Sequence, residues 1–266
     1  MSIKELFQQG DLQACLDATA EAVRNAPSDG EARFRFAELL CFNGQYERAD
    51  KQLNAIQSAD VTVVATINTF RRVLRAEYAR TSFFEQGSLP EFVSPPDDIL
   101  KEYLDASIDL RSGNPSGAKA KIDEACGRVP QVCGTVNGQE FTGVRDLDDL
   151  IAPVLEVFTE NGNYLWMGFD QIRSMTFKPP GNLFSLLWRT AKLEMCDDTV
   201  ADVCFVPTRY VLSGQSDDIA VRLGRATNWS QDEAAPIRGV GQKVLQFGEN
   251  AIPLLELKEV HISEGK

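Results

Sequence analysis

Residues 10–27, GDLQACLDATAEAVRNAP, and residues 44–57, GQYERADKQLNAIQ, both begin with a glycine, and the two glycines stand thirty-four residues apart. Five residues after each glycine comes a small side chain, Cys15 in the first stretch and Ala49 in the second. A thirty-four-residue period with small residues where paired helices cross is typical of tetratricopeptide hairpins. The spacing therefore predicts stacked helical hairpins at the start of the chain.

A third copy of this pattern lies in residues 99–130. Its glycine is Gly113, its small residue is Ala118, and a proline ends it, as Pro27 ends the first copy. Residues 61–84, VTVVATINTFRRVLRAEYARTSFF, are uninterrupted by glycine or proline and predict one long helix between the copies. The following residues, EQGSLPEFVSPPDD, contain four helix breakers and predict a loop that ends at Asp97 or Asp98 as a helix N-cap.

Stacked helical hairpins have a concave face that commonly receives a peptide or a helix. By analogy with such repeats, four residues occupy positions that line this groove: Phe34, Glu38, Tyr103 and Ser107. The alternative is that some of them pack between neighbouring hairpins.

The second half of the chain changes character after about residue 133. Residues 145–162, RDLDDLIAPVLEVFTENG, predict a helix that begins with three aspartates, and Pro153 must then lie in its first turn or kink it. Short β-rich runs follow, separated by glycine and proline: 163–169, 189–196, 200–212 and 252–262. These runs predict a compact antiparallel sheet or a small barrel.

The predicted fold class is therefore α+β, with a tetratricopeptide-like helical-repeat domain over residues 1–133 and a β-rich domain over residues 134–266. The six cysteines include no Cys-x-x-Cys pair, and a chain of this length builds a core without disulfides, so we expect reduced and mostly buried thiols.

Charge and hydropathy exclude several classes of partner. The formal net charge of −12, from 27 basic and 39 acidic residues, repels phosphate backbones and anionic membranes, so we expect neither nucleic-acid binding nor membrane insertion. No apolar run is long enough for a transmembrane helix, and the N-terminal residues lack the pattern of a secretory signal. These features predict a cytoplasmic protein.

Catalytic motifs are absent from the sequence. The only histidine, His261, lies near the end of the chain on a predicted strand, where a solvent-exposed role is expected. No phosphate-binding loop, dinucleotide fingerprint or nucleophile elbow occurs. Helix capping explains Asp146, Asp148 and Asp149 without a metal. We therefore expect no enzyme activity, no cofactor and no metal; a hydrolase using paired carboxylates, such as those at 197–198 or 217–218, is the alternative.

Residues 222–229, RLGRATNW, combine a glycine, an arginine and a tryptophan. One interpretation is structural: a strand bends at Gly224, Arg225 bonds to carbonyl or carboxylate groups, and Trp229 covers the end of the β-domain core. The other is that Arg225, Thr227 and Trp229 form a partner-binding patch, because Trp and Arg are favoured anchors at interfaces.

The ordered set of motifs in the second half resembles the ImpE/SciE/TagJ family of type VI secretion accessory proteins. The motifs that carry this resemblance are RDLDDLIAPVLEVF, YLWMGFDQI, LLWRTAKLEM, VPTRY, RLGRATNW and GVGQKVL. Members often have a proline where this chain has MGFD, and often an arginine where it has Lys243. A two-pronged arginine contact at that position would be weaker with lysine.

This resemblance implies a non-enzymatic adaptor. It would bind the small subunit of the contractile sheath, hold an exposed sheath helix and modulate its handling by the AAA+ ATPase that disassembles the sheath. Two alternatives remain: a hydrolase or ligand-binding β-domain with a helical-repeat targeting domain, and a general peptide-binding repeat module.

Overall fold

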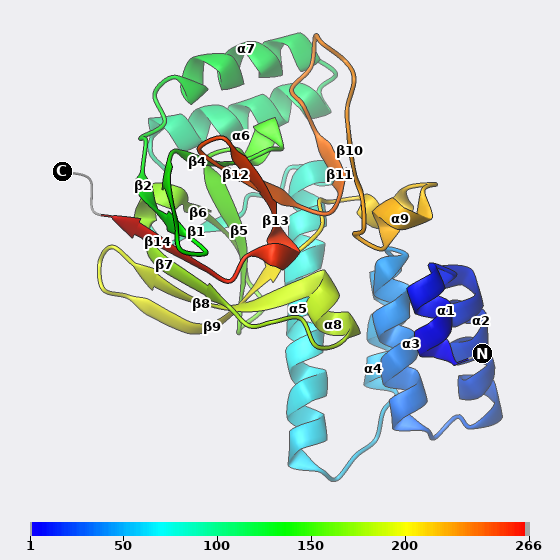
Figure 1. Ribbon diagram of the computed structural model, residues 1–266. Helices are drawn as coiled ribbons and strands as arrows, with labels where there is room; N and C mark the ends of the chain where they lie inside the picture. Colours follow the sequence, from blue (N-terminus) through cyan, green and yellow to red (C-terminus); the bar gives the residue numbers. More distant parts are fainter. Residues whose placement is uncertain (1, 264–266) are drawn as a thin grey trace.

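The computed structural model describes residues 2–263. Seven helices occupy the first half of the chain (Figure 1). Their bounds are α1 Ile3–Gln9, α2 Leu12–Asn25, α3 Gly30–Phe42, α4 Tyr46–Asn54, α5 Val61–Gln86, α6 Asp98–Arg111 and α7 Pro115–Cys126. The predicted long helix is α5, and Asp97 is the N-cap of α6, where its carboxylate accepts a hydrogen bond from the Leu100 N–H.

The repeat period is confirmed by the positions of these helices. Each of α2, α4 and α7 begins two residues after the glycine that marks its copy. The small residues Cys15, Ala49 and Ala118 are fully buried, as the close approach of paired helices requires. The pairs are antiparallel neighbours in the fold: α1 with α2, α3 with α4, and α6 with α7.

A nine-stranded sheet dominates the second half, in the order β1-β6-β5-β9-β8-β7-β14-β2-β3. Its strands are β1 Glu91–Phe92, β2 Cys133–Val136, β3 Gln139–Thr142, β5 Val154–Thr159, β6 Tyr164–Gly168, β7 Ile172–Phe177, β8 Trp188–Met195, β9 Val200–Pro207 and β14 Glu259–Ser263. All adjacent pairs are antiparallel except β1 with β6. The spaced β-rich runs predict this antiparallel sheet. Residues 91–92 lie in the segment predicted as a loop, so the strand β1 was not expected there.

Smaller elements complete this half of the chain. A three-stranded sheet joins β13 Asn250–Pro253, β12 Val244–Phe247 and β4 Val144–Asp146, and a two-stranded sheet joins β10 Thr227–Trp229 and β11 Gly239–Gly241. Short helices are α8 Leu183–Leu187 and α9 Ile219–Arg222, and the 3-10 turns are η1 Asp149–Ile151, η2 Phe169–Gln171, η3 Ser213–Gln215 and η4 Leu254–Glu256.

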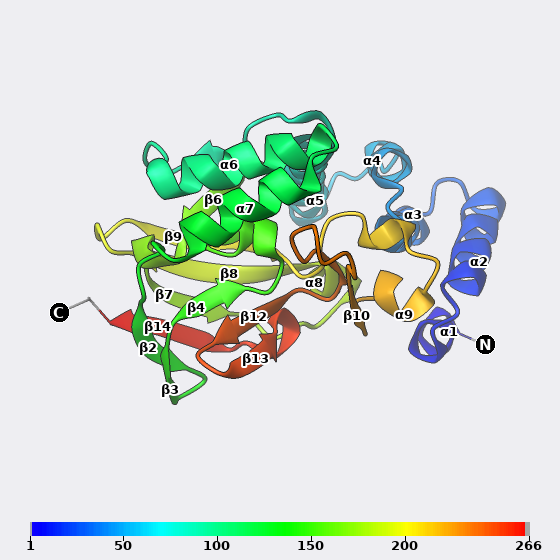
Figure 2. The same ribbon diagram turned by 90° about the horizontal axis from the view of Figure 1, so that it is seen from above.

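The large sheet has a hydrophobic core on each face. One core contains the helices together with Phe158, Trp166 and Trp188 from the sheet, so helical and β segments share it. The other contains Met175, Leu193 and further strand residues together with residues of β12 and η4. Figures 1 and 2 show α6 and α7 lying over the sheet, α5 crossing beside it, and α1 to α4 grouped at the N-terminal end.

The helix predicted for residues 145–162 is wrong. The structure has β4, the turn η1 and the strand β5 there, and Pro153 stands between η1 and β5. Every residue from Val154 to Phe158 is buried, because β5 is an interior strand covered on both faces. Strands buried on both faces give continuous apolar runs without alternation, and such a run has no periodicity that separates it from a buried helix.

The predictions for the histidine and for the cysteines differ in outcome. His261 lies on β14 with its side chain exposed, as predicted. None of the six cysteines forms a disulfide, but only Cys15, Cys41 and Cys204 are buried; the expectation of mostly buried thiols is wrong for the three exposed ones, Cys126, Cys133 and Cys196.

Candidate functional site

The four residues predicted to line one concave groove do not lie together. Glu38, Tyr103 and Ser107 are buried, with 7%, 0% and 2% of their surfaces exposed, and only Phe34 is partly open. Ser107 lies inside the fold, and its hydroxyl donates to the Leu104 carbonyl oxygen at 2.6 Å within α6. Segments of the second half contact both helices that carry these residues: α8 contacts α3, and η1 contacts α6.

Glu38 joins α3 to α8 in the interior. Its Oε1 accepts a hydrogen bond from the Phe184 N–H at 3.1 Å. Burial raises the pKa of Glu38 to about 7, and the Phe184 N–H and the charge of Arg35 offset only part of this effect. Glu38 is therefore not a groove residue but a buried acid that titrates near neutral pH.

We expect Glu38→Gln to stabilise the protein at pH 8 and to have little effect at pH 4. The folded-state pKa of about 7 lies above the ordinary value of 4.5, so the stability lost through this carboxylate grows between about pH 4.5 and pH 7 and is constant at higher pH. Glutamine keeps the acceptor for Phe184 and removes the charge, which raises the free energy of unfolding by about 2 kcal/mol at pH 8. Denaturant titrations at both pH values measure this. Glu31→Gln, an exposed site on the same helix, is the control, and a gain for Glu38→Gln that is equal at both pH values would contradict the assignment.

Phe34 lines an open apolar groove between α3 and the start of α5. The groove has a volume of about 380 Å³. Its lining consists of Gly30, Glu31, Phe34, Ile56, Gln57, Ser58, Thr62, Val63, Thr66 and Ile67. The Phe34 ring packs edge-to-face on Phe70 at 5.5 Å, which ties this groove to the core beneath it.

The first turn of α5 carries exposed valines, of which Val63 lines this groove. Val61 is 82% exposed, and Val63 and Val64 are each 40% exposed. Figure 1 shows this end of α5 projecting away from the sheet. This end of α5 therefore presents apolar side chains to solvent beside the groove.

The arginine of RLGRATNW binds the other half of the molecule. The Arg225 guanidinium donates to the Phe7 and Gln8 carbonyl oxygens at 2.5 and 3.1 Å and lies over the Phe7 ring. These carbonyls belong to the last turn of α1, where the helix dipole favours a cation. Arg225 therefore caps a helix that precedes it by more than two hundred residues.

A second arginine acts in the same way on α3. Arg209, from the VPTRY motif, is buried and donates to the Phe42 and Cys41 carbonyl oxygens at 3.1 and 3.0 Å. Arg222 donates to Asn43 Oδ1, at the C-cap of the same helix, at 2.9 Å. Arginines of the C-terminal half thus fix the ends of helices in the N-terminal half.

Thr227 and Trp229 also make intramolecular contacts. The Thr227 hydroxyl donates to the Gln242 carbonyl oxygen at 2.7 Å, and the Trp229 ring packs edge-to-face on Tyr210 at 5.6 Å. These contacts favour the structural interpretation of RLGRATNW over a partner-binding patch, because the side chains of Arg225 and Thr227 already have partners in the chain. The strand expected before Gly224 is wrong, since Ile219–Arg222 form the helix α9.

A buried charge cluster lies where α5 meets the sheet: Glu77, Arg80, Asp146, Glu156 and Lys243, each 3% exposed or less. Arg80 donates to both carboxylate oxygens of Glu156, at 2.8 and 2.9 Å, and to Glu77 at 3.1 Å. Two aromatic residues complete this side of the cluster: the Tyr164 hydroxyl donates to Glu156, and the Trp188 indole N–H donates to Glu77. Burial would raise the pKa of Glu156, but Arg80 and Lys243 outweigh it and hold that pKa well below its usual range.

Lys243 forms the other side of the cluster. Its ammonium group lies 2.6 Å from Glu156 and 3.0 Å from Asp146, so it bridges carboxylates on β5 and β4. A point charge with several donors serves this geometry, so the position does not need a two-pronged arginine. Burial raises the pKa of Asp146 to about 6, against the opposing charge of Lys243. The Tyr210 hydroxyl donates to the second Asp146 oxygen at 2.8 Å.

The cluster brings carboxylates together, but all five of its side chains are buried in the interior. The five best-defined cavities among residues 2–263 have no cluster residue in their linings. The acidic pairs suggested for a hydrolase are not part of it, and Arg225 lies elsewhere. Sequence reasoning missed the cluster, although single charges inside apolar runs, such as Glu156 in VLEVF, are a signal of buried ion pairs.

The aspartates at residues 146–149 form hydrogen bonds and ion pairs within the fold. Asp148 accepts from the Leu150 N–H as N-cap of η1 and pairs with Arg238 at 2.8 Å, and Asp149 pairs with Arg145. No group of three or more potential metal ligands occurs within residues 2–263. Nor is any helix of that segment long and apolar enough to cross a bilayer.

The part of the chain that carries most of these features is similar to known proteins. The family model described as ImpE protein matches residues 138–261, which include the charge cluster except for Glu77 and Arg80. The type VI secretion system accessory component TagJ of Pseudomonas aeruginosa is 31% identical over 98% of this chain and 90% of its own length. The chain belongs to the ImpE/TagJ family. This relationship places it among type VI secretion accessory components.

The fold is also found in a crystal structure, that of protein VPA1032 from Vibrio parahaemolyticus. The two chains align with a TM-score of 0.88 at 24% identity, over 100% of this chain and 98% of the other. The joint arrangement of repeat helices and β-sheets is therefore shared across strongly diverged sequences.

Proposed function

We propose that this ImpE/TagJ family member is a non-enzymatic cytoplasmic adaptor that binds the small subunit of the type VI sheath. In this role it would present a sheath helix to the AAA+ disassembly ATPase. The observation that carries the proposal is the apolar groove at Phe34, which lies open on a molecule whose converging carboxylates are sealed in its core. Grooves of this kind receive the apolar face of an amphipathic helix.

The groove sets the position of the proposed contact. Val63 lines it, whereas Val61, on the same helix turn, does not. Both valines are exposed, so substituting either one leaves the core intact. The sheath helix would place apolar side chains against Phe34 and Val63, with solvated groups facing outward.

Val63→Glu is expected to weaken capture of the purified sheath small subunit by at least about tenfold, because a carboxylate would be desolvated in an apolar contact. Val61→Glu adds the same charge beside the groove and is expected to bind as the wild type does. A titration of immobilised protein with the sheath subunit measures both affinities. Equal losses in the two variants would point to general charge repulsion instead of the groove, and no capture by the wild type would refute the proposal.

A further inference from the structure

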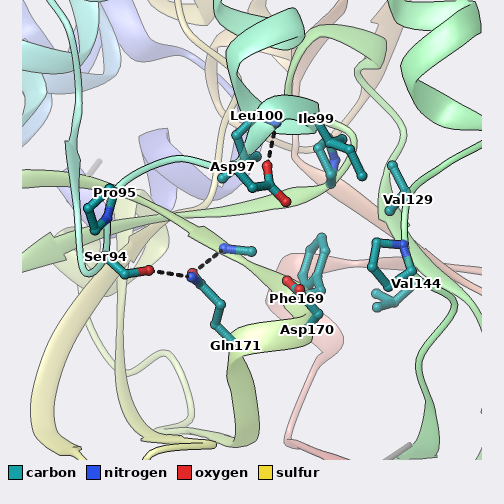
Figure 3. Close-up of a pocket in the computed structure, with 13 residues that line it drawn as sticks. Ser94, Pro95, Asp97, Ile99, Leu100, Val129, Val144, Phe169, Asp170 and Gln171 are labelled. Atoms are coloured by element: carbon teal, nitrogen blue, oxygen red, sulfur yellow. Dashed lines mark hydrogen bonds between the residues drawn. The ribbon is translucent and has the colours of Figure 1, made fainter.

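Two cavities of the molecule differ in the charge of their linings. Among the described residues, the cavity of about 120 Å³ drawn in Figure 3 is lined by Asp97 and Asp170 and by no basic side chain. Its Asp97 accepts the Leu100 N–H, and its Gln171 donates to Ser94, so these groups already bond within the fold. A cavity of about 390 Å³ beside α5 has the opposite charge, with three arginines and one aspartate in its lining.

The arginine-lined cavity lies where α5 runs beside α4 (Figure 1). It is lined by Asp50 of α4 and by six residues of α5, which are Asn68, Arg71, Arg72, Leu74, Arg75 and Tyr78. Arg71 is neutralised there, because Asp50 accepts from its guanidinium at 2.7 and 3.2 Å. None of these residues lines the groove at Phe34, so a ligand in this cavity would contact a different part of α5.

Arg72 and Arg75 have no acidic partner to offset their charges. Within residues 2–263 neither forms an ion pair with a carboxylate. Arg72 Nη1 donates to the Glu160 carbonyl oxygen at 3.2 Å, and Arg75 Nε donates to the Gly162 carbonyl oxygen at 3.3 Å. Because carbonyl oxygens carry only a partial negative charge, two cations one helical turn apart repel each other until an anion binds between them.

The β5–β6 turn fixes the position of these two side chains. Gly162, in this turn, has a φ of +79°, and a Cβ atom there would lie 2.5 Å from the Arg72 carbonyl oxygen and 3.0 Å from Arg75 Nη2. Glycine is therefore what allows the turn to pack this closely on α5. Both arginines are exposed, but the turn holds their guanidinium groups and so reduces the side-chain entropy that binding costs.

Each guanidinium keeps one two-nitrogen edge available. Arg72 bonds through Nη1, so its Nε and Nη2 have no hydrogen-bond partner among the described residues. Arg75 bonds through Nε, so its Nη1 and Nη2 are available in the same part of the chain. Such an edge matches the two oxygens of one carboxylate. Side chains three or four residues apart on a helix are neighbours, so two carboxylates with this spacing on a partner helix would meet the two arginines.

The charge of the whole molecule selects the class of anion. The formal net charge is −12, so a nucleic-acid strand that extends past the two arginines would meet a repelling surface. A protein segment can place two carboxylates on the arginines and present uncharged side chains elsewhere. Tyr78, which is 39% exposed and lines the same cavity, offers those uncharged side chains an aromatic surface.

We propose that this cavity binds a helical segment of another protein that carries two carboxylates four residues apart. One carboxylate accepts hydrogen bonds from Nε and Nη2 of Arg72, and the other accepts from Nη1 and Nη2 of Arg75. Charge pairs at such a surface determine orientation and partner choice more than affinity. The site does not depend on the proposed function, because it is built from different residues than the groove at Phe34.

The test uses an alanine-based helical peptide with two glutamates four residues apart and a twin peptide with glutamine at both positions. Titration of the full chain at low ionic strength is expected to show about tenfold weaker binding of the glutamine twin. Arg72→Gln and Arg75→Gln are each expected to weaken binding of the glutamate peptide about twofold to fivefold. Arg24→Gln removes the same charge from the exposed surface of α2 and is expected to bind as the wild type does.

The NMR signal of the Arg72 Nε–H locates the contact. This proton has no acceptor within residues 2–263, so its signal is expected to shift when the glutamate peptide binds. No binding of the glutamate peptide, binding without this shift, equal affinities for the two peptides, or unchanged affinity in both arginine variants would each overturn the proposal. Displacement of the peptide by an equal concentration of inorganic phosphate would also overturn it, because the arginine pair would then be a site for small anions.

Discussion

Arg80→Met is expected to lower the free energy of unfolding by about 3–5 kcal/mol. Arg80 is 2% exposed and holds Glu156 through two hydrogen bonds and Glu77 through a third. It also donates to the Arg209 carbonyl oxygen at 3.0 Å. Methionine matches much of its volume but leaves Glu77 with no cationic partner in the buried charge cluster. The carboxylate must then stay charged in the interior or take up a proton, and both outcomes destabilise the fold.

Arg71→Met on the same helix is the matched control. Arg71 also makes a two-pronged contact with a carboxylate, Asp50, but the two side chains are 40% and 35% exposed. Pairs screened by solvent contribute less than about 1 kcal/mol. Chemical denaturation of both variants measures the difference. Similar small losses for Arg80→Met and Arg71→Met would mean that the buried charge cluster does not hold α5 to the sheet.

The sequence predicts the helical half of this fold because its signals are local. The thirty-four-residue period marks the starts of α2 and α4, and the glycine before each helix is adjacent to it in the chain. Helix breakers and caps such as Asp97 act on the next few residues, so their effect is visible in a short window. The spaced strands of the second half were predicted for the same reason, as glycine and proline punctuate them.

The candidate sites were harder to predict because they depend on contacts between distant segments. The groove expected for Glu38 and Ser107 requires a face that is open to solvent, but both residues are buried in the fold. Arg225 meets Phe7 across 218 residues of sequence, and Arg80 meets Glu156 across 76. Spacing along one chain carries no direct information about such pairs. Phe34 is only partly buried, and it lines the open groove between α3 and α5.

Gly241 illustrates how strongly such a distant contact can constrain one position. It lies on β11 opposite Thr227, in the small sheet that holds RLGRATNW in place. Its φ of +108° is a backbone conformation that side-chain-bearing residues rarely adopt. A Cβ atom there would lie 2.1 Å from the Ala226 carbonyl oxygen, which accepts the Gln242 N–H.

We therefore expect Gly241→Ala to destabilise the protein by at least about 3 kcal/mol, from backbone strain combined with steric overlap. The clash is with a backbone atom, so no rotation of a side chain relieves it. Relief requires β10 and β11 to separate, which breaks the Thr227 to Gln242 hydrogen bond and moves Trp229 away from Tyr210. Denaturation measures the loss, and tryptophan fluorescence reports the displacement of Trp229.

Gly181→Ala is the control for this prediction, because nothing lies within 4 Å of the Cβ it would introduce and its φ is not positive. It is expected to unfold as the wild type does. If Gly241→Ala were equally stable, the close approach of β11 to Ala226 would not exist in solution. If instead Gly241→Ala folds with reduced stability and still captures the sheath small subunit, RLGRATNW acts on structure alone. If the variant remains folded but no longer captures the subunit, Arg225, Thr227 and Trp229 belong to the partner-binding surface.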